Sequence, residues 1–259
     1  MRIARFVSGD SVGYGVVEGD HSDPESFEVA VITSHPFADP EFSGARLPLA
    51  QVRLLAPILP SKVLAFGRTY ADHAAELGHA VATEPLMFLK PSTSVIGPGD
   101  PIRLPALSNE VHYEAELAVV IGRLCKDVPS AQATDVILGY TCANDVTARD
   151  LQRSDGQWSR AKGFDTFCPL GPWIETNLDP ADLRVTCTLD AAVVQDGRTS
   201  QMVFSVAELV AYASAAMTLL PGDVILTGTP AGVGPMRDGS FVEVQIEGVG
   251  SLINPVIAR

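Results

Sequence analysis

The sequence predicts an α+β protein in which β-strands predominate. Short apolar segments rich in β-branched residues recur along the chain, and turns that contain Gly, Pro or Asp separate them. Two segments have the spacing and the end signals of a helix. Strands with so few helices between them favour a mixed, mainly β domain over a series of βαβ units. A chain of 259 residues is long enough for one large domain with a smaller one attached.

The first part of the chain, residues 1–56, is predicted to be a small N-terminal β-rich domain. Its expected strands are residues 2–7, 12–17 and 28–32. No cluster of polar residues in this part suggests a functional site. The sequence APILP follows at residues 56–60, and proline restricts the residue before it to extended backbone. We therefore place the boundary there and assign residues 57–259 to the main domain.

The main domain is predicted to combine several strands with two helices. The strands are expected at residues 62–66, 116–121, 137–143, 185–189, 224–227 and 241–246. One helix is expected from Ser205 to about residue 219, because Ser205 and Glu208 have the spacing of a capping box and Pro221-Gly222 stops the segment. A shorter helix capped by Ser130 is expected at residues 130–135.

Charge and composition exclude several classes of partner. The net charge of −13 argues against nucleic acids and anionic membranes, because the electrostatic part of such binding would be repulsive. The longest uncharged apolar stretch, residues 209–220, is too short to span a membrane, and the N-terminus lacks a secretory signal. Reduced, buried thiols of a cytoplasmic protein are expected for the four widely spaced cysteines: Cys125, Cys142, Cys168 and Cys187.

Two acidic residues, Glu114 and Glu116, would lie on the same face of an expected strand. Burying two like charges side by side is costly unless a cation lies between them. Asp145 ends the next apolar segment and could bring a third carboxylate to the same place. Three carboxylates suit a hard, oxygen-preferring ion such as Mg²⁺ or Mn²⁺. The alternative is that both glutamates lie on the solvent face of a half-buried strand.

His73 and Glu76 could lie on one face of a helix, where the carboxylate would fix the tautomer of the imidazole. His73 would then be a general base toward a water near the metal, and the alternative is a surface helix contact. Lys162 stands among small and apolar residues. It is consistent either with a buried cation that stabilises an enolate oxygen or with a lysine on a surface loop.

Arg149 and Gln152 follow Asp145 at helical spacing, on a face that points either to a substrate or to solvent. An arginine there suits bidentate recognition of a carboxylate. Thr229 follows a strand, where its hydroxyl and N–H could hold a carboxylate or simply form a turn. The sequence contains no P-loop, no GxGxxG at a helix start and no GxSxG, so neither a nucleotide cofactor nor a serine nucleophile is expected.

Six motifs occur in one order between residues 61 and 259: GRTYADH at 67–73, FLKP at 88–91, HYEAE at 112–116, NDVTARD at 144–150, AKGFD at 161–165 and TGTP at 227–230. In this the chain resembles the fumarylacetoacetate hydrolase family. The resemblance implies a roll-like, mixed β main domain and a catalytic divalent metal, Mg²⁺ or Mn²⁺, held by Glu114, Glu116 and Asp145. It also implies a His73–Glu76 catalytic dyad on a mobile lid. We expect this lid at about residues 69–83, because the small side chains there offer little apolar surface for permanent anchoring. Further catalytic or substrate-binding positions implied by it are Lys162, Arg68, Tyr70, Lys90, Arg149, Gln152 and Thr229.

The resemblance further implies an enzyme that acts on a small 2-oxo acid, which chelates the metal through its carboxylate and 2-oxo oxygens. The metal would stabilise the enolate formed by C–C bond hydrolysis or decarboxylation, as in acylpyruvate hydrolases and oxaloacetate decarboxylases. Isomerisation or decarboxylation of 2-hydroxyhepta-2,4-diene-1,7-dioate in aromatic catabolism shares this intermediate and stays an alternative. A catalytically silent metal-binding scaffold is an alternative of another class. A homodimer is expected by resemblance.

Overall fold

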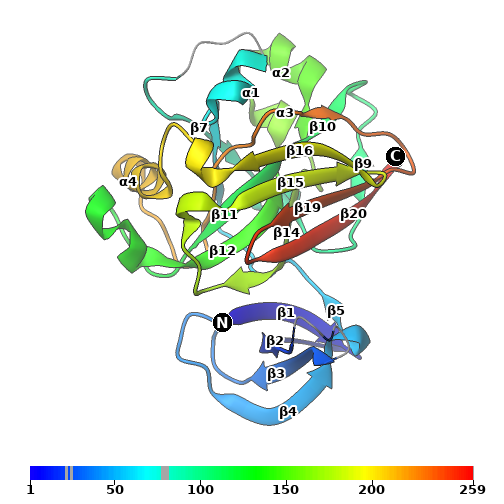
Figure 1. The fold of residues 1–259 in the computed structure, drawn as a ribbon, viewed down its shortest axis with the longest axis vertical. Helices are drawn as coiled ribbons and strands as arrows, with labels where there is room; N and C mark the ends of the chain where they lie inside the picture. The colour runs from blue at the N-terminus through cyan, green and yellow to red at the C-terminus, as the bar shows by residue number, and fades with distance from the viewer. Residues whose placement is uncertain (21–22, 24–25, 77–81, 259) are drawn as a thin grey trace.

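The computed structural model describes residues 1–20, 23, 26–76 and 82–258, and for residues 73–75 it describes the backbone alone. Figure 1 shows a large β-rich body with the N-terminal strands as a lobe beneath it. Helices α1, α2 and α3 lie at the opposite end of the body, and α4 lies at its side. The architecture confirms the predicted α+β, mainly β class.

Strands form most of the described secondary structure. The N-terminal strands are β1 (Arg2–Ser8), β2 (Ser11–Glu18), β3 (Glu28–Ile32), β4 (Phe42–Pro48) and β5 (Arg53–Leu54). The next strands are β6 (Val63–Gly67), β7 (Leu86–Lys90), β8 (Val95–Ile96), β9 (Ile102–Leu104), β10 (Val111–Tyr113), β11 (Ala115–Ile121), β12 (Ile137–Asn144) and β13 (Thr147–Ala148). The last are β14 (Cys168–Glu175), β15 (Arg184–Leu189), β16 (Ala192–Arg198), β17 (Val224–Leu226), β18 (Gly234–Pro235), β19 (Phe241–Ile246) and β20 (Gly250–Ala258).

The helices are short and lie between strands. The α-helices are α1 (Ala71–Glu76), α2 (Arg149–Asp155), α3 (Ser159–Lys162) and α4 (Val206–Ala216). The 3₁₀ helices are η2 (Leu49–Gln51), η3 (Ser92–Ser94), η4 (Ser130–Val136), η5 (Pro180–Asp182) and η6 (Thr199–Gln201). None of the helices among the described residues is long and apolar enough to cross a membrane.

The described strands form three sheets. The largest runs in the order β4-β3-β2-β1-β14-β12-β11-β17-β6-β7, and β5 and β8 pair at its side. A second sheet has the order β16-β15-β19-β20-β9, and a small third one has the order β13-β10-β18. Most neighbours are antiparallel, but β6 pairs with β17, β8 with β14 and β9 with β20 in parallel. The sheets are therefore mixed, as predicted.

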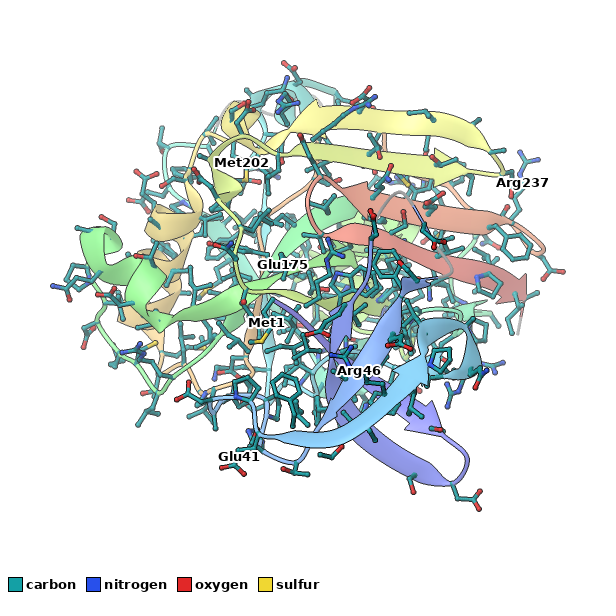
Figure 2. All side chains as sticks on the ribbon, turned by 60° about the horizontal axis from the view of Figure 1, so that its bottom comes forward. Met1, Glu41, Arg46, Glu175, Met202 and Arg237 are labelled. Atoms are coloured by element: carbon teal, nitrogen blue, oxygen red, sulfur yellow. The ribbon has the colours of Figure 1, made fainter. Side chains whose placement is uncertain are left out.

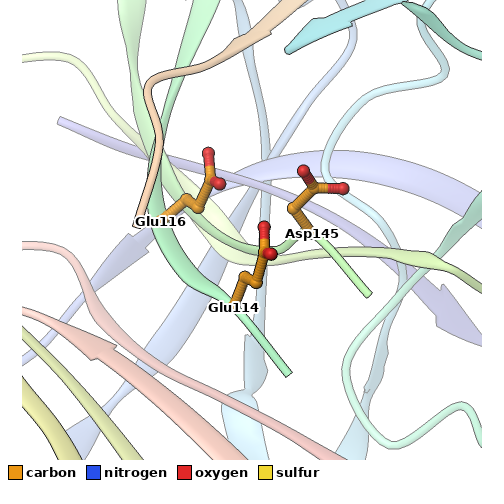
Figure 3. A group of neighbouring side chains, drawn as sticks. All are labelled: Glu114, Glu116 and Asp145. Carbon is orange, nitrogen blue, oxygen red and sulfur yellow. The ribbon is translucent and has the colours of Figure 1, made fainter. Parts of the chain in front are cut away.

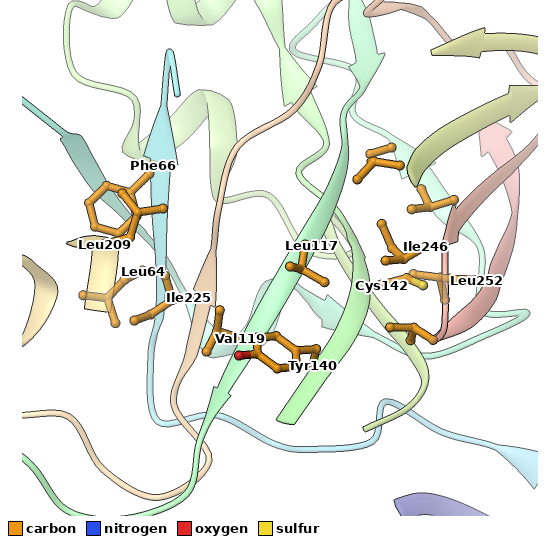
Figure 4. Packing of buried hydrophobic residues seen from close by; sticks show 14 of the residues in the cluster. Leu64, Phe66, Leu117, Val119, Tyr140, Cys142, Leu209, Ile225, Ile246 and Leu252 are labelled. Carbon is orange, nitrogen blue, oxygen red and sulfur yellow. The ribbon is translucent and has the colours of Figure 1, made fainter. Parts of the chain in front are cut away.

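The main core lies between the largest sheet and the second sheet. Every residue of β11 is buried, so this strand is covered on both faces. Leu117 and Cys142 on one side pack in the same cluster as Ile246 and Leu252 on the other (Figure 4). The strand that carries the acidic motif is thus central to the fold, and its position is set by packing on both sides.

The N-terminal strands join the main body through a shared sheet. Arg2 and Ile3 of β1 pair with Glu175 and Ile174 of β14. Glu175 lies beside the start of β1 (Figure 2), and its carboxylate accepts a hydrogen bond from the Met1 ammonium at 2.8 Å. Ile3 packs in one apolar cluster with Ile174 and other residues of the main body. The two parts therefore share both backbone pairing and core. The domain boundary itself stays a prediction.

Two helix predictions need correction. The capping box of Ser205 and Glu208 is present, but α4 ends at Ala216 instead of about residue 219. Leu219 exchanges backbone hydrogen bonds with Cys125, at 2.9 and 3.0 Å, which draws the chain away from the helix axis. Residues 130–136 form a 3₁₀ helix, and Pro129, not Ser130, occupies its N-cap. Ser130 makes no capping hydrogen bond, because it is already inside the first turn.

Several strands were not predicted. They are β4, β7, β14, β16 and β20, besides the very short ones. β14 contains Pro169, Gly171 and Pro172, which are poor strand formers, yet it pairs with β1, β12 and β8. Neighbouring strands supply the stabilisation that its own sequence lacks. All four cysteines are free, as expected, and all but the partly buried Cys125 are buried. A cytoplasmic location stays a prediction.

Candidate metal centre and active site

Three carboxylates converge at the end of β11 and β12. Glu114 lies in a one-residue break between β10 and β11, and Glu116 follows within β11. Ala115 pairs with Asn144, so the antiparallel register brings Asp145 opposite Glu114, whose carbonyl accepts the Asp145 N–H at 2.9 Å. One carboxylate oxygen from each of the three residues lies within 4.8 Å of the others (Figure 3). The predicted metal triad is therefore assembled by strand register.

The triad is buried. The exposed fractions of Glu114, Glu116 and Asp145 are 4%, 1% and 1%, so the alternative of a solvent-facing strand is wrong. Burial, together with the neighbouring charges of Asp145 and Glu114, raises the pKa of the Glu116 carboxyl well above its usual value. The charged form of Glu116 is thus disfavoured by its surroundings, and a cation beside it would stabilise that form.

Two buried lysines face the carboxylates. Lys162 Nζ donates to Glu114 Oε2 at 2.7 Å and to Asp145 Oδ2 at 2.6 Å, and Lys90 Nζ donates to Asp145 Oδ1 at 2.6 Å. Burial alone would lower the pKa of Lys162, but Asp145 and Glu114 raise it, so this lysine is charged. The alternative of a surface lysine at position 162 is wrong. For Lys90, the contacts are with Asp145 and the Val146 carbonyl, and contact with a substrate stays a prediction.

Arg149 and Gln152 lie on one face of α2, as their spacing predicts. The Arg149 guanidinium forms an ion pair with Glu114 and donates to Gln152 Oε1 at 2.9 Å. It also lies 3.4 Å from Nδ1 of His112, a residue that the sequence did not single out. These contacts fix the guanidinium beside a metal-ligand candidate, where it can orient an anionic substrate.

The Gly228–Thr229 turn closes the other side of the triad. The Gly228 N–H donates to Glu116 Oε2 at 2.6 Å. The Thr229 hydroxyl donates to the Ala115 carbonyl at 2.8 Å. The proton of this hydroxyl is therefore used within the protein in this structure. Contact of Thr229 with a substrate carboxylate, through its hydroxyl or its N–H, stays a prediction.

A cavity of about 210 Å³ opens beside these groups. Its lining consists of Phe66, Gly67, Arg68, Glu114, Glu116, Arg149, Gln152, Arg153, Trp158, Lys162 and Thr229. Three arginines and a lysine among them make it suited to an anion. The sequence did not single out Trp158. Its indole accounts for the glycine at position 67, because a Cβ there would lie only 2.8 Å from the ring.

The loop between β6 and α1 holds two predicted substrate-binding residues in unusual states. Arg68 has a left-handed backbone with φ of 60°, a conformation that costs free energy in a non-glycine residue. Thr69 stabilises it, because its hydroxyl donates to the Thr227 carbonyl at 2.7 Å. The Tyr70 hydroxyl is buried and has no hydrogen-bond partner among the described residues. Burial and the charge of Glu116 raise the pKa of Tyr70, so this hydroxyl is a donor close to the carboxylates.

The predicted dyad is described only in part. Glu76 ends α1, and its carboxylate accepts the Gly232 N–H at 3.1 and 3.2 Å. The side chain of His73 lies outside the described residues, and so does the middle of the predicted lid, residues 77–81. The catalytic role of His73 and Glu76 stays a prediction from the sequence.

Most of the chain matches one known protein family. Residues 62–257 match the family described as fumarylacetoacetate (FAA) hydrolase C-terminal, which is well over half of the chain. The chain belongs to the fumarylacetoacetate hydrolase family. Residues 1–57 match a second family, described as Rv2993c-like, N-terminal.

Three relatives of this fumarylacetoacetate hydrolase family member bear on its chemistry. A 2-hydroxyhepta-2,4-diene-1,7-dioate isomerase from Mycobacterium marinum is 54% identical with a TM-score of 0.94, over 100% of this chain and 99% of that one. The human mitochondrial oxaloacetate tautomerase FAHD2A is 45% identical, over 82% of this chain and 71% of its own. A Sphingobium maleylpyruvate hydrolase was solved in complex with manganese(II) ion and pyruvate. It is 36% identical with a TM-score of 0.81, over 100% of this chain and 99% of that one.

Proposed function

We propose that the protein is a divalent-metal-dependent enzyme that acts on small 2-oxo acids through an enolate, by C–C bond hydrolysis or decarboxylation. The observation that carries this proposal is the buried triad of Glu114, Glu116 and Asp145 at a cavity lined with cationic side chains. The similar maleylpyruvate hydrolase supports it, since that protein was solved with manganese(II) and with pyruvate, a 2-oxo acid.

The residues at the triad fit Mg²⁺ or Mn²⁺. All three donors are carboxylates, which these hard ions prefer, and their oxygens lie close enough to share one ion. In the described part of the chain, Glu114 and Asp145 each face a cationic side chain, while Glu116 forms no ion pair. A divalent ion would balance the charge of Glu116. When bound, it supplies Lewis-acid stabilisation of negative charge on a substrate oxygen.

The protein's own groups support the binding of an anion next to the triad. Lys90, Lys162 and Arg149 offset the three carboxylates in charge, so a divalent ion would leave the centre positive and suited to a carboxylate ligand. Arg149, held by Gln152, orients such a carboxylate, and the Lys162 ammonium donates hydrogen bonds to oxygen atoms that gain negative charge. Burial strengthens each of these interactions by excluding water.

A second candidate function is tautomerisation or isomerisation of a 2-oxo dicarboxylate. It is favoured by the similarity to an oxaloacetate tautomerase and to a 2-hydroxyhepta-2,4-diene-1,7-dioate isomerase, an activity we associate with aromatic catabolism. Both reactions pass through the same kind of enolate, so the same residues serve them. The silent scaffold is less well supported, because the triad, Lys162 and Arg149 are all present, and both cationic side chains pair with carboxylates of the triad.

A direct assay tests the proposal. Purified protein is incubated with Mg²⁺ or Mn²⁺ and, separately, with oxaloacetate, an acylpyruvate and the heptadienedioate, and products are followed by absorbance and by NMR. We expect metal-dependent turnover of at least one substrate, loss of it in Asp145→Asn, and retention in the control Asp10→Asn, which changes an exposed turn residue. Pyruvate release indicates cleavage or decarboxylation, and tautomer exchange alone indicates the second candidate. Tight Mn²⁺ binding without turnover of any substrate contradicts both.

We also propose that the protein is a homodimer, as the resemblance implies. Light scattering coupled to size-exclusion chromatography is expected to give twice the mass of one chain. A single-chain mass at micromolar concentration would contradict this proposal.

A further inference from the structure

We infer that Gln195 is a positioning residue for the metal centre, although it lies on a different sheet from the triad. Gln195 is in β16, and its exposed fraction is 1%. It contacts the backbone between the two ligand candidates Glu114 and Glu116, and it also contacts the turn that donates a hydrogen bond to Glu116. The inference rests on the metal centre of the proposed function and adds a residue that no motif of the sequence includes.

The side-chain amide of Gln195 makes three hydrogen bonds. Its Oε1 accepts the Ala115 N–H at 3.0 Å, and its Nε2 donates to Thr229 Oγ at 2.8 Å and to the Pro230 carbonyl at 2.8 Å. A backbone N–H can only donate and a carbonyl can only accept, so the orientation of the amide is determined by its partners. These three side-chain hydrogen bonds are made with the backbone of Ala115 and Pro230 and with the hydroxyl of Thr229.

Ala115 is the residue between the two glutamate ligands. Ala115 lies opposite Asn144 of β12, but its N–H and C=O point to the other side of the strand. On that side β11 pairs with β17 only from Ala118 onward. At Ala115 a strand neighbour is therefore replaced by side chains: Gln195 takes the N–H, and Thr229 donates its hydroxyl to the carbonyl. Buried backbone groups need such partners. Movement of Ala115 would turn both Glu114 and Glu116, because they flank it.

Gln195 also holds the turn that contacts Glu116. Gly228 donates its N–H to the Glu116 carboxylate, and the next two residues are those that Gln195 binds. Gln195, Thr229 and Ala115 thus form a closed ring of hydrogen bonds. The approach is close, since a Cβ on Gly197 would lie 2.6 Å from Pro230 Cβ. The Gln195 amide therefore sets the position of Glu114 and Glu116 relative to the turn whose N–H binds Glu116.

The test compares Gln195→Met, Gln195→Glu and the control Gln201→Met. Gln201 is a nearby glutamine whose Oε1 accepts the Arg198 N–H at 2.6 Å, away from Ala115. Mn²⁺ affinity is measured by calorimetry, and kcat and KM are measured in the substrate assay. Folding is checked by circular dichroism of the metal-free proteins. Partners behind metal ligands typically contribute about 10- to 100-fold in metal affinity.

We expect folded Gln195→Met to bind Mn²⁺ about 10- to 100-fold more weakly, with kcat lowered, while Gln201→Met binds as wild type does. Gln195→Glu keeps the acceptor for Ala115 and loses the two donated hydrogen bonds, so its affinity should lie between the two. Unchanged Mn²⁺ affinity in folded Gln195→Met would overturn the inference and leave the metal centre intact. If Gln195→Met does not fold, Gln195→Glu decides by the same measurement. Failure of the wild type to bind Mn²⁺ would overturn the proposed metal centre and this inference with it.

Discussion

At the scale of single residues, Lys162 shows how burial changes the meaning of a side chain. In the sequence it stands in a short segment of small residues, which is compatible with a surface loop. In the structure it is 2% exposed and bridges Glu114 and Asp145. A buried ammonium and the carboxylates around it stabilise one another, because each offsets the charge of the other. Lys162 therefore contacts carboxylates of two of the three residues that would hold a metal ion.

This arrangement predicts opposite effects of Lys162→Met on catalysis and on metal affinity. We expect kcat to fall about 10²- to 10³-fold, as for the loss of a donor to developing negative charge. Mn²⁺ affinity should be kept or increased, because the competing ammonium is gone. The control is Lys126→Met on the surface. Rate assays and calorimetry decide it, and weaker Mn²⁺ binding with normal kcat would make Lys162 a structural support only.

At the scale of elements, helix α4 is the part of the fold whose local signals were clearest. The Ser205 hydroxyl accepts the Glu208 N–H, and the Glu208 carboxylate accepts from both the hydroxyl and the N–H of Ser205. These bonds hold the pKa of Glu208 below its ordinary value of 4.5. The start of the helix is therefore determined locally, whereas its end depends on the pairing of Leu219 with Cys125.

We predict that Ser205→Ala lowers the free energy of unfolding by about 1 kcal/mol at pH 7. Because the pKa of Glu208 is lowered on folding, its contribution is present above pH 4.5 and is lost as pH falls through the folded pKa. The difference between wild type and Ser205→Ala should therefore shrink as the pH falls below 4.5. Urea unfolding of both proteins over this pH range measures the difference in the free energy of unfolding. Ser159→Ala, the first residue of α3 and not its N-cap, is the control, and an equal loss there would contradict a capping effect.

At the scale of the whole molecule, the N-terminal strands and the main body share one sheet and one apolar cluster. Ile3 is buried against the main body, and β1 covers the edge of β14. Parts that share a core unfold together. We therefore expect a single cooperative unfolding transition for the full chain, although residues 1–57 and 62–257 match different families.

Ile3→Ala tests this coupling. It should cost about 2 to 5 kcal/mol, the range for truncating a buried isoleucine, and the transition should stay single. Val12→Ala, at a side chain that is 56% exposed, should change the stability by less than about 0.5 kcal/mol. Denaturation followed by both tryptophan fluorescence and circular dichroism would show separate midpoints if the N-terminal strands unfolded independently.

The sequence by itself determined the features that depend on local pattern. It identified the strands that carry the site, the α4 cap, and the motif residues Glu114, Glu116 and Asp145, because periodicity, capping spacing and each short motif can be recognised in a local stretch of sequence. It did not indicate β14 or β16, whose proline, glycine and polar residues are typical of loops.

Only the tertiary structure decided which groups meet. Strand register between β11 and β12 brings Asp145 to Glu114, and packing of the second sheet brings Gln195 to Ala115. Burial excluded the solvent-facing interpretation of Glu114 and Glu116, and the hydroxyl of Thr229 donates to the Ala115 carbonyl of the same site. These outcomes rest on contacts between segments far apart in the chain, whose energies depend on desolvation and geometry that no short stretch of sequence contains.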